Sequence, residues 1–303
     1  MYIRISLFLI YLFVNFINCQ SQIIINEIMT DPSPVVGLPD CEYIELYNSG
    51  DIGIQIKDWK IKGGSCDCVL PEYVFPAKSY LLIASTTAKN KLDIYCKTFY
   101  LPCFPTLNNE GKSIWLTDSA RNVRDIVSYS DTWFGSEIKS GGGWSLERKD
   151  ASLNCSCSQN WKASSNAAGG SPGSANSVVE NVTLPASVAL YTANITDSSV
   201  TIYFSSPMDS SSLLNVQNYS FDHGFAKPLA SSVNFPFYNS VTLQIPSILQ
   251  PDEIYRVTCS SAILNCDGQP IVPTELRFAL PRKIEKGDVV INEVMFNPEP
   301  GNE

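Results

Sequence analysis

The sequence contains one histidine, His223, among 303 residues. A Ser-His-Asp or Cys-His catalytic site would have to use this side chain, but its neighbours Asp222 and Gly224 are typical of a turn. A single histidine also excludes a histidine-rich zinc site and the H-E-x-x-H helix of metalloproteases. We therefore predict a protein that is not an enzyme and holds no cofactor, and we assign no catalytic, cofactor-binding or metal-binding residues.

Positive charge is also scarce. Lysine and arginine total 21 against 30 aspartates and glutamates, which gives a formal net charge of −9. A protein that binds duplex nucleic acid usually has a basic patch that displaces counterions from phosphate. The densest basic group, Arg282, Lys283 and Lys286, lies in a predicted linker. The sequence therefore predicts no nucleic-acid partner.

Long apolar runs are absent after the N-terminus. There, Arg4 precedes a thirteen-residue run, Ile5–Ile17, which only Ser6 and Asn15 interrupt. A membrane-spanning helix needs about 20 residues, whereas this length and charge order are typical of a signal peptide. We predict a signal peptide at residues 1–21, a secreted or cell-surface location, and no membrane span after cleavage. A lipid on Cys19 and an uncleaved anchor are the alternatives.

Ten cysteines fit an oxidising compartment, in which thiols pair. With Cys19 set aside, the others are Cys41, Cys66, Cys68, Cys96, Cys103, Cys155, Cys157, Cys259 and Cys266. An odd number implies a free thiol, a bridge between domains, or pairing with Cys19. We expect a local Cys259–Cys266 disulfide and a bridge between the two C-x-C segments. Zinc sites prefer two to four residues between thiolates, so a metal is the weaker alternative.

One sequence motif, which we call the repeated phrase, occurs twice. Residues 23–34 read IIINEIMTDPSP, and residues 289–300 read VVINEVMFNPEP. Such an internal repeat indicates one structural unit that is used more than once. We therefore expect residues 283–303 to be a linker followed by the truncated start of a second copy of the first domain.

Alternation of apolar and polar residues predicts short strands and no long amphipathic helix. The predicted strands are residues 22–29, 42–48, 52–61, 79–84, 113–117, 123–130, 200–204, 241–245 and 255–259. A short helix is expected within residues 210–216, and the glycine-rich stretch 141–177 is expected to be a closing loop and linker. This pattern predicts an all-β, antiparallel sandwich or barrel.

Several motifs together resemble the lamin tail domain of bacterial secreted and surface proteins. They are Ile25–Met29 with Pro32, Glu42–Asn48, Trp59, Gly142–Arg148, Asn160-Trp161 and Gly170–Gly173. Residues 177–282 resemble the Ig-like domains of bacterial S-layer and adhesion proteins, through Phe204–Asp209, Leu213–Tyr219, Tyr255–Val257 and Asn265–Gln269. The resemblance implies two consecutive Ig-like antiparallel β-sandwich domains, at residues 22–176 and 177–282, and no catalytic centre.

Five carboxylates are expected near one end of the first domain: Glu27, Asp31, Asp40, Glu42 and Glu45. A structural role is favoured, because Glu27 recurs as Glu293 in the repeated phrase. Turn hydrogen bonds or an ion pair with Arg148 would provide that role. Calcium binding and an acid/base pair of a glycosidase are the alternatives.

These observations predict a non-catalytic extracellular or cell-surface modular protein. It would act as a structural spacer, an adhesion module or a binding module, with an extracellular protein or polysaccharide as its partner. Two alternatives stay open. The modules could serve a secreted hydrolase whose catalytic domain lies beyond residue 303, or they could bind a partner in a calcium-dependent way.

Overall fold

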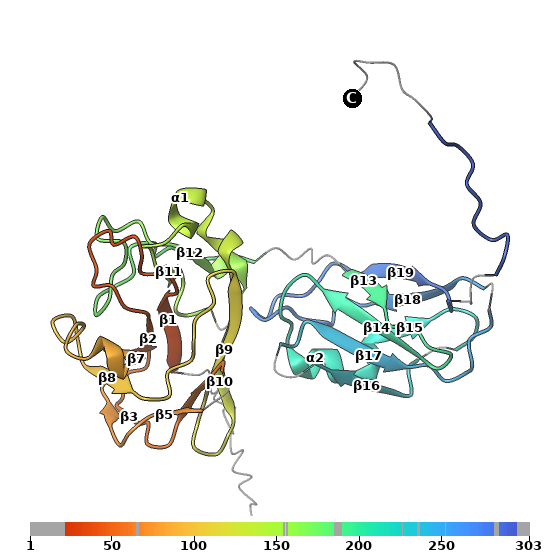
Figure 1. Ribbon diagram of the computed structural model, residues 1–303. Coiled ribbons are helices and arrows are strands. Elements are labelled where there is room, and N and C mark those ends of the chain that lie inside the picture. The colour runs from red at the N-terminus through yellow and green to blue at the C-terminus, as the bar shows by residue number, and fades with distance from the viewer. Residues whose placement is uncertain are drawn as a thin grey trace, which may run out of the picture. The chain divides into compact units, whose positions relative to one another are not determined.

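The computed structural model describes residues 22–64, 67–153, 155, 157–184, 190–225, 227–234, 237–251, 253–281 and 285–295. These residues form two compact units (Figure 1). The first contains the described residues up to 154 together with 163–178, and the second contains those of 155–162 and from 179 onward. This boundary falls within a strand, Trp161–Ala163, that is hydrogen-bonded into the main sheet of the first unit and is described with it. Within the described residues, no helix is long and apolar enough to cross a membrane.

The prediction of an all-β fold is confirmed, and the first unit is built on a six-stranded sheet (Figure 1). The strand order is β12-β11-β1-β2-β7-β8. The strands are β1 (Ile23–Met29), β2 (Tyr43–Asn48), β7 (Tyr80–Ser85), β8 (Thr98–Leu101), β11 (Leu146–Arg148) and β12 (Trp161–Ala163). Every residue of β1 is buried, so the repeated phrase lies in the interior of this sheet.

One pair of strands departs from the antiparallel prediction. Strands β7 and β8 run parallel, with Leu82 opposite Thr98 and Ser85 opposite Leu101. A parallel pair needs a crossover of about a dozen residues, and the segment 86–97 between the two strands provides it. That segment includes the 3-10 turn η1 (Thr86–Ala88). The alternation pattern identifies a strand but does not give the direction of its partner.

A second sheet of the first unit has the order β10-β9-β4-β5. Its strands are β4 (Lys60–Lys62), β5 (Cys68–Val69), β9 (Gly111–Thr117) and β10 (Val123–Ser130), and β3 (Ile54–Gln55) pairs with β6 (Val74–Phe75) separately. The prediction of one strand over residues 52–61 is wrong. Asp58 takes a left-handed conformation with φ of 62°, and the Trp59 N–H donates to the Ile56 carbonyl at 3.1 Å. This turn breaks the segment into β3 and β4.

The stretch 141–177, predicted as loop and linker, also contains two strands of the main sheet. Strand β11 pairs directly with β1, opposite Glu27 and Ile28. All three of its residues, Leu146, Glu147 and Arg148, are buried. Because buried charged residues stand where apolar ones usually do, β11 lacks the alternation that identifies a strand.

Glycines fix the backbone that leads into β11. The Gly143 N–H donates to the Asp31 carbonyl at 2.7 Å. Gly142 has φ of 108°, and a Cβ there would overlap the Ser33 carbonyl. Only glycine adopts this conformation without strain. The Gly-Gly-Trp motif is therefore packed directly against the proline-rich loop that follows β1.

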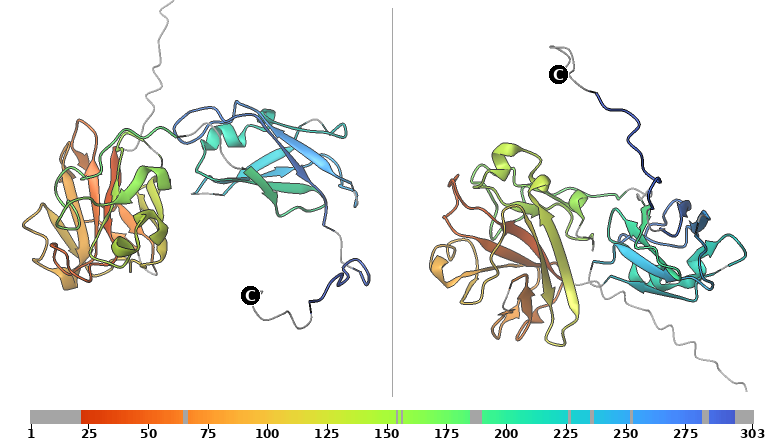
Figure 2. Two further views of the ribbon diagram at one scale, coloured as in Figure 1. Left: turned by 90° about the horizontal axis from the view of Figure 1, so that it is seen from above. Right: turned by 45° about the vertical axis from the view of Figure 1, so that its right-hand side comes forward.

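The second unit has a four-stranded and a three-stranded sheet (Figures 1 and 2). The four-stranded sheet has the order β13-β14-β17-β16, with β13 (Leu190–Ala193), β14 (Ser199–Phe204), β16 (Ala230–Val233) and β17 (Ser240–Gln244). The three-stranded sheet has the order β15-β18-β19, with β15 (Tyr219–Phe221), β18 (Tyr255–Cys259) and β19 (Thr274–Phe278). Buried side chains of both sheets, including Ile202, Leu243 and Val257, form one core. The described residues thus build an all-β unit with two sheets around one core.

Two α-helices occur among the described residues: α1 (Glu137–Ser140) and α2 (Ser210–Leu214). The prediction of a short helix within residues 210–216 is confirmed by α2, which the 3-10 turn η4 (Val216–Asn218) follows. Asp209 begins α2 as its N-cap, and its Oδ1 accepts from the Ser212 N–H at 2.7 Å. Such a cap satisfies a backbone donor that has no partner in the helix.

Replacing Asp209 with alanine should destabilise the second unit by about 1 kcal/mol, the usual effect of losing an N-cap. Differential scanning calorimetry of the full chain would measure this as a lower midpoint of one transition. Asp209→Ser, which keeps a hydroxyl acceptor, should restore most of the loss. Equal midpoints for Asp209→Ala and the unaltered chain would show that the cap contributes nothing.

The second copy of the repeated phrase is in a different environment from the first. Among the described residues 285–295 there is no strand, and the side chains of Val289 and Ile291 are 76% and 86% exposed. The corresponding residues of β1 are buried. The predicted signal peptide at residues 1–21 and the end of the phrase at 296–300 lie outside the described residues.

Candidate functional site

Three glutamates of neighbouring strands meet on one face of the six-stranded sheet. Glu27 of β1 lies opposite Glu147 of β11 on one side and opposite Glu45 of β2 on the other. All three side chains have 0% exposure. We call Glu27, Glu45 and Glu147 the glutamate cluster. Strand register alone brings them together, because residues opposite each other on antiparallel strands are about 5 Å apart.

An irregularity in β1 allows both Asn26 and Glu27 to reach this cluster. The pairing of β1 with β2 shifts register between Ile25 and Glu27, as in a β-bulge. Asn26 Nδ2 donates to Glu45 Oε1 at 2.8 Å and to Asn176 Oδ1 at 2.8 Å. The Asn-Glu pair of the repeated phrase thus contributes two adjacent side chains to one polar group.

A loop covers the glutamate cluster and donates to each of its members. We call residues 169–177 the covering loop. The Ser171 N–H donates to Glu27 Oε1 at 3.0 Å, and the Gly173 N–H donates to Glu45 Oε2 at 2.6 Å. Ser177 donates through both its N–H and its hydroxyl to Glu147 Oε2, each at 2.7 Å. The glutamates therefore accept backbone donors that an irregular loop would otherwise bury without partners.

Two glutamates of the cluster, Glu27 and Glu45, have raised pKa values and so hold their protons more firmly than exposed glutamates do. Burial, together with the charge of Glu147, raises the pKa of Glu27 from 4.5 to about 7. Burial and the charge of Glu27 raise the pKa of Glu45 well above its usual value. The Tyr43 hydroxyl donates to Glu27 Oε1 at 2.6 Å. Burial and nearby negative charge both disfavour the ionised form of a carboxyl group, and solvent does not reach these side chains.

On the other face of the sheet, a buried ion pair joins the two sheets of the first unit. Arg148 Nη2 donates to Asp125 Oδ2 at 2.5 Å, and the exposure of the two side chains is 0% and 5%. Arg148 Nε donates to the Ile25 carbonyl at 2.8 Å, and Asp125 Oδ2 accepts from the Ile25 N–H at 2.7 Å. Asp125 belongs to β10 and Arg148 to β11. The pair thus satisfies the backbone of β1 next to its bulge.

The five carboxylates expected to lie together are divided in the structure. Glu27 and Glu45 join the glutamate cluster. Asp31 and Asp40 instead both accept from Ser33 on the surface, at 3.2 and 3.0 Å, and Glu42 accepts weakly from the Leu107 N–H at 3.4 Å. Among the described residues, no group of three or more His, Cys, Asp or Glu side chains has the arrangement of a metal site.

Turn hydrogen bonds provide the role that we expected for Glu27, whereas Arg148 pairs with Asp125. Glu147, Asp125 and Asn176 are the members of these networks that sequence reasoning missed. The signal available for Glu147 and Arg148 was their place in a motif, Gly142–Arg148, that already resembled the family. Their roles depend on strand register and on contacts between sheets, which the sequence does not give.

His223 lies in a turn of the second unit, as predicted, with φ of 55°. Its Nδ1 is 2.8 Å from Asp222 Oδ1, and its ring is tilted against Tyr255 with centroids 4.9 Å apart. These contacts orient the ring towards a carboxylate and an aromatic residue, not towards a nucleophile. The structure therefore gives His223 the surroundings of a turn residue.

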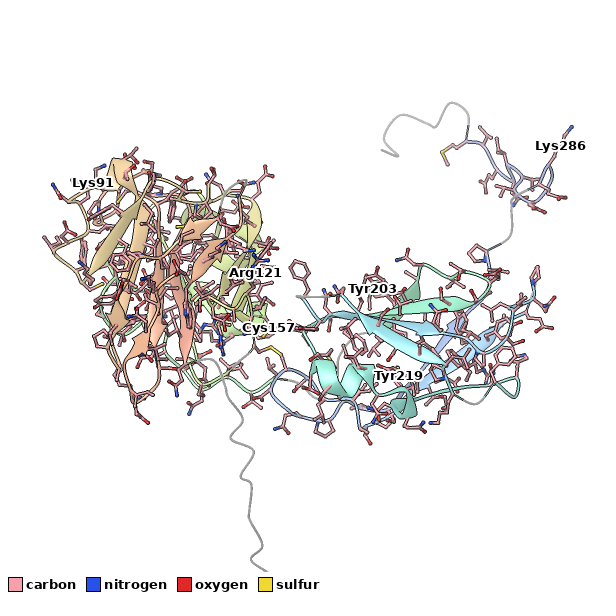
Figure 3. All side chains as sticks on the ribbon, turned by 90° about the horizontal axis from the view of Figure 1, so that it is seen from below. Lys91, Arg121, Cys157, Tyr203, Tyr219 and Lys286 are labelled. Atoms are coloured by element: carbon pink, nitrogen blue, oxygen red, sulfur yellow. A yellow bond between two sulfur atoms is a disulfide. The ribbon has the colours of Figure 1, made fainter. Side chains whose placement is uncertain are left out.

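The disulfides differ from those that we expected. Cys266 pairs with Cys155, 111 residues away in the sequence, and Cys103 is also disulfide-bonded. The label of Cys157, two residues from Cys155 in the sequence, marks this part of the chain in Figure 3. The expected Cys259–Cys266 bridge is wrong, because the Cys259 side chain points into the core of the second unit while Cys266 lies in a turn. Burial raises the pKa of Cys259 to about 12, which keeps this unpaired thiol protonated and unreactive.

The expected bridge between the two C-x-C segments is also not supported. Cys68 is buried and unpaired, and Cys155 pairs with Cys266. Cys68 is part of β5, where burial raises the pKa of its thiol to about 12. Its side chain is therefore a small apolar core residue.

Comparisons with known proteins agree with part of this architecture. The family model of the lamin tail domain matches residues 19–131. This range includes β1 and β2, with Glu27 and Glu45, and ends before β11 and the covering loop. A comparison with curated proteins gave no match.

Two solved structures show limited similarity. The N-terminal part of the bacterial S-layer protein SbsC is 18% identical, with a TM-score of 0.29, over 32% of this chain and 24% of that one. The S-layer protein rSbsC(31-844) is 17% identical, with a TM-score of 0.28, over 31% of this chain and 13% of that one. The chain thus spans less than a quarter of the length of these S-layer proteins. The family match is the informative one: over residues 19–131 this chain is similar to the lamin tail domain.

Proposed function

We propose that this chain is a secreted or cell-surface modular protein that acts as a non-catalytic structural spacer or binding module. Its partner would be an extracellular protein or polysaccharide. In this proposal the lamin tail domain and the unit that follows it are rigid all-β modules that present their surfaces to that partner.

The observation that carries the proposal is the complete enclosure of the glutamate cluster. A carboxyl group that acts as a general acid or base must come within hydrogen-bonding distance of a substrate. Here the three glutamates have 0% exposure, and each accepts from the covering loop. Their hydrogen-bonding capacity is used to hold this loop against the sheet, which supports a structural role over a catalytic one.

An extracellular location is supported by two independent features. The N-terminal sequence has the charge order and length of a signal peptide. The disulfide Cys155–Cys266 is of a kind that persists in oxidising compartments and is rare in the cytosol. The repeated phrase at residues 289–300 further supports a modular chain, and we propose that a second lamin tail unit begins there.

The test is to recover the chain from its native host and to determine its location, its N-terminal residue and its disulfides. We expect it in the culture medium or exposed to protease on intact cells, with a mass that begins near Gln20–Gln22 and with Cys155 joined to Cys266. A chain found inside the cell, with its N-terminal segment intact and both cysteines reduced, would overturn the proposal. An active hydrolase domain on the same polypeptide would instead favour the accessory-module alternative.

Calcium should not stabilise the protein. A ligand that binds only the folded state raises the midpoint of unfolding, but no group of three or more acidic, histidine or cysteine side chains among the described residues could hold a metal ion. We expect equal melting temperatures with millimolar calcium and with a chelator, measured by calorimetry. A calcium-dependent rise would establish the calcium-binding alternative.

A further inference from the structure

One face of the four-stranded sheet in the second unit has an unusual composition. In β14, Val200, Ile202 and Phe204 point into the core, so the alternate residues lie on the outer face. Strand register then places ten residues there: Tyr191, Ala193, Ser199, Thr201, Tyr203, Ala230, Ser232, Ser240, Thr242 and Gln244. We call these ten residues the outer face. None of them is charged, and eight carry a hydroxyl or an amide.

The three-stranded sheet of the same unit does carry charged residues on its outward side. The outward positions of β18 and β19 include Arg256, Glu275 and Arg277. Arg256 and Glu275 approach each other to 3.7 Å with both side chains about half exposed. A solvated sheet face in this chain therefore carries charges of both signs, whereas the outer face carries none.

Two tyrosines form an aromatic platform at one edge of the outer face. Tyr191 of β13 lies opposite Tyr203 of β14, with ring centroids 5.1 Å apart and ring planes 7° apart. Asn194 Nδ2 donates to the Tyr203 hydroxyl at 2.9 Å and so holds that ring (Tyr203 is labelled in Figure 3). One side of the Tyr191 ring faces Tyr203, and because β13 is the edge strand of its sheet, no further strand among the described residues covers the other side. Tyr191 is 59% exposed.

Hydroxyl groups continue the surface beside the platform. Thr201, which is only 6% exposed, and Thr242 lie opposite each other with their hydroxyl oxygens 2.9 Å apart, and the exposed Ser232 follows in the same row. Each hydroxyl can both donate and accept a hydrogen bond. The outer face thus combines a flat aromatic ring with adaptable polar groups and has no net charge.

We infer that the outer face binds a neutral polysaccharide, with a sugar ring stacked on Tyr191. A sugar presents weakly positive C–H groups on one face, which the negative face of a tyrosine ring attracts. Its hydroxyls match the exposed side chains of Ser232 and Gln244. A polyanion would require lysine or arginine, which the outer face lacks. This inference rests on the proposed function and names the chemical class of its partner.

Affinity electrophoresis of the full chain tests the inference. Native gels would contain hydroxyethylcellulose, mixed-linkage β-glucan, galactomannan or dextran as neutral probes, and alginate as an anionic control. We expect at least one neutral polysaccharide to retard the protein, and this retardation should change little with added salt. Alginate should not retard the protein. Retardation by no neutral probe, or stronger retardation by alginate, would overturn the inference.

Two variants and a control locate the site. Tyr191→Ala should weaken binding about tenfold, the loss expected for one aromatic contact of about 1.4 kcal/mol. Tyr191→Phe keeps the ring and should bind nearly as well. Ile138→Ala removes an apolar side chain of the first unit that is 82% exposed and should change nothing. Since Tyr191 is at an exposed edge, all three should retain the calorimetric midpoint of the unaltered chain.

Equal binding by Tyr191→Ala and the unaltered chain would remove the outer face as the site. That result would leave the proposed function untouched, because location and processing are measured separately. A chain that is found inside the cell but binds a neutral polysaccharide through Tyr191 would have the opposite meaning: the site would be correct and the extracellular role wrong.

Discussion

Replacing Arg148 with methionine should destabilise the first unit by about 3–5 kcal/mol, the usual effect of removing one partner of a buried ion pair. Methionine fills a similar volume but leaves the Asp125 carboxylate buried without its cation. It also removes the donor to the Ile25 carbonyl. Urea unfolding followed by tryptophan fluorescence would measure the loss. Four of the chain's five tryptophans, Trp59, Trp115, Trp133 and Trp144, belong to the first unit, so this unit dominates the signal.

An exposed ion pair provides the matched control. Lys57 Nζ and Glu72 Oε2 are 3.0 Å apart, but their side chains are 54% and 68% exposed. Solvent-exposed pairs contribute about 0–1 kcal/mol, so Lys57→Met should have little effect. In the double variant Arg148→Met with Asp125→Leu, the unpaired charge is absent, and part of the stability should return. A loss below about 1 kcal/mol for Arg148→Met would contradict this account of how the two sheets are joined.

Alternation in the sequence predicts the two-sided strands of this chain well. The predicted strands 123–130 and 255–259 coincide with β10 and β18. In both, buried and less buried residues alternate, which is the pattern that a period of two describes. The local physics of a half-buried strand was therefore sufficient to locate these elements.

Strands that are polar on a buried face could not be predicted in this way. In β11, Glu147 and Arg148 are both buried and serve opposite faces of the sheet. Burial of charge is acceptable only with specific partners, and those partners, Ser171, Ser177 and Asp125, are distant in the sequence. Similarly, the break at Asp58 depends on one left-handed residue in an otherwise regular alternation.

The candidate site was predicted only in part for the same reason. The repeated Asn-Glu phrase correctly drew attention to Glu27 and indicated a role in the fold. Glu27 accepts from the covering loop, whereas Asp31 and Asp40 accept hydrogen bonds at the surface, because nearness in sequence does not place side chains on one face. The bulge next to Glu27 and its pairing with both Glu45 and Glu147 decide what this residue contacts.

The first unit should lose stability as the pH rises from about 5 to 8. In the folded state the pKa of Glu27 is raised from 4.5 to about 7, because the side chain is buried beside Glu147. Between these values the folded protein binds more protons than the unfolded chain, so this contribution is complete below pH 4.5 and is lost as the pH rises through 7. One group with this shift accounts for about 3 kcal/mol.

Two further buried carboxyl groups of the first unit act in the same direction as Glu27. Burial raises the pKa of Glu45 and of Asp125. Tyr43, which donates to Glu27, and Cys96, which is close enough to feel its charge, have pKa values raised by burial and stay protonated over this range. Asp67 and Asp118 have lowered pKa values, so they act only below their usual 3.8. The decrease between pH 5 and 8 should therefore be monotonic.

Glu27→Gln isolates the contribution of the cluster. The amide oxygen can still accept from Tyr43 and from the Ser171 N–H, and its NH2 group can donate towards Glu147, so the hydrogen bonds survive while the titrating proton is removed. We expect the free energy of unfolding of the variant to change less with pH. Its value relative to that of the unaltered chain should therefore increase as the pH rises. Glu72→Gln, at an exposed site, should leave the profile unchanged.

Urea unfolding at pH 5, 6, 7 and 8, again with the tryptophan signal, would measure both profiles. A stability that rises with pH would contradict the buried cluster directly. A decrease that Glu27→Gln fails to flatten would assign the titration to Glu45 or Asp125 instead. The comparison thus tells whether Glu27, the glutamate of the repeated phrase, is the group whose ionisation weakens the first unit as the pH rises.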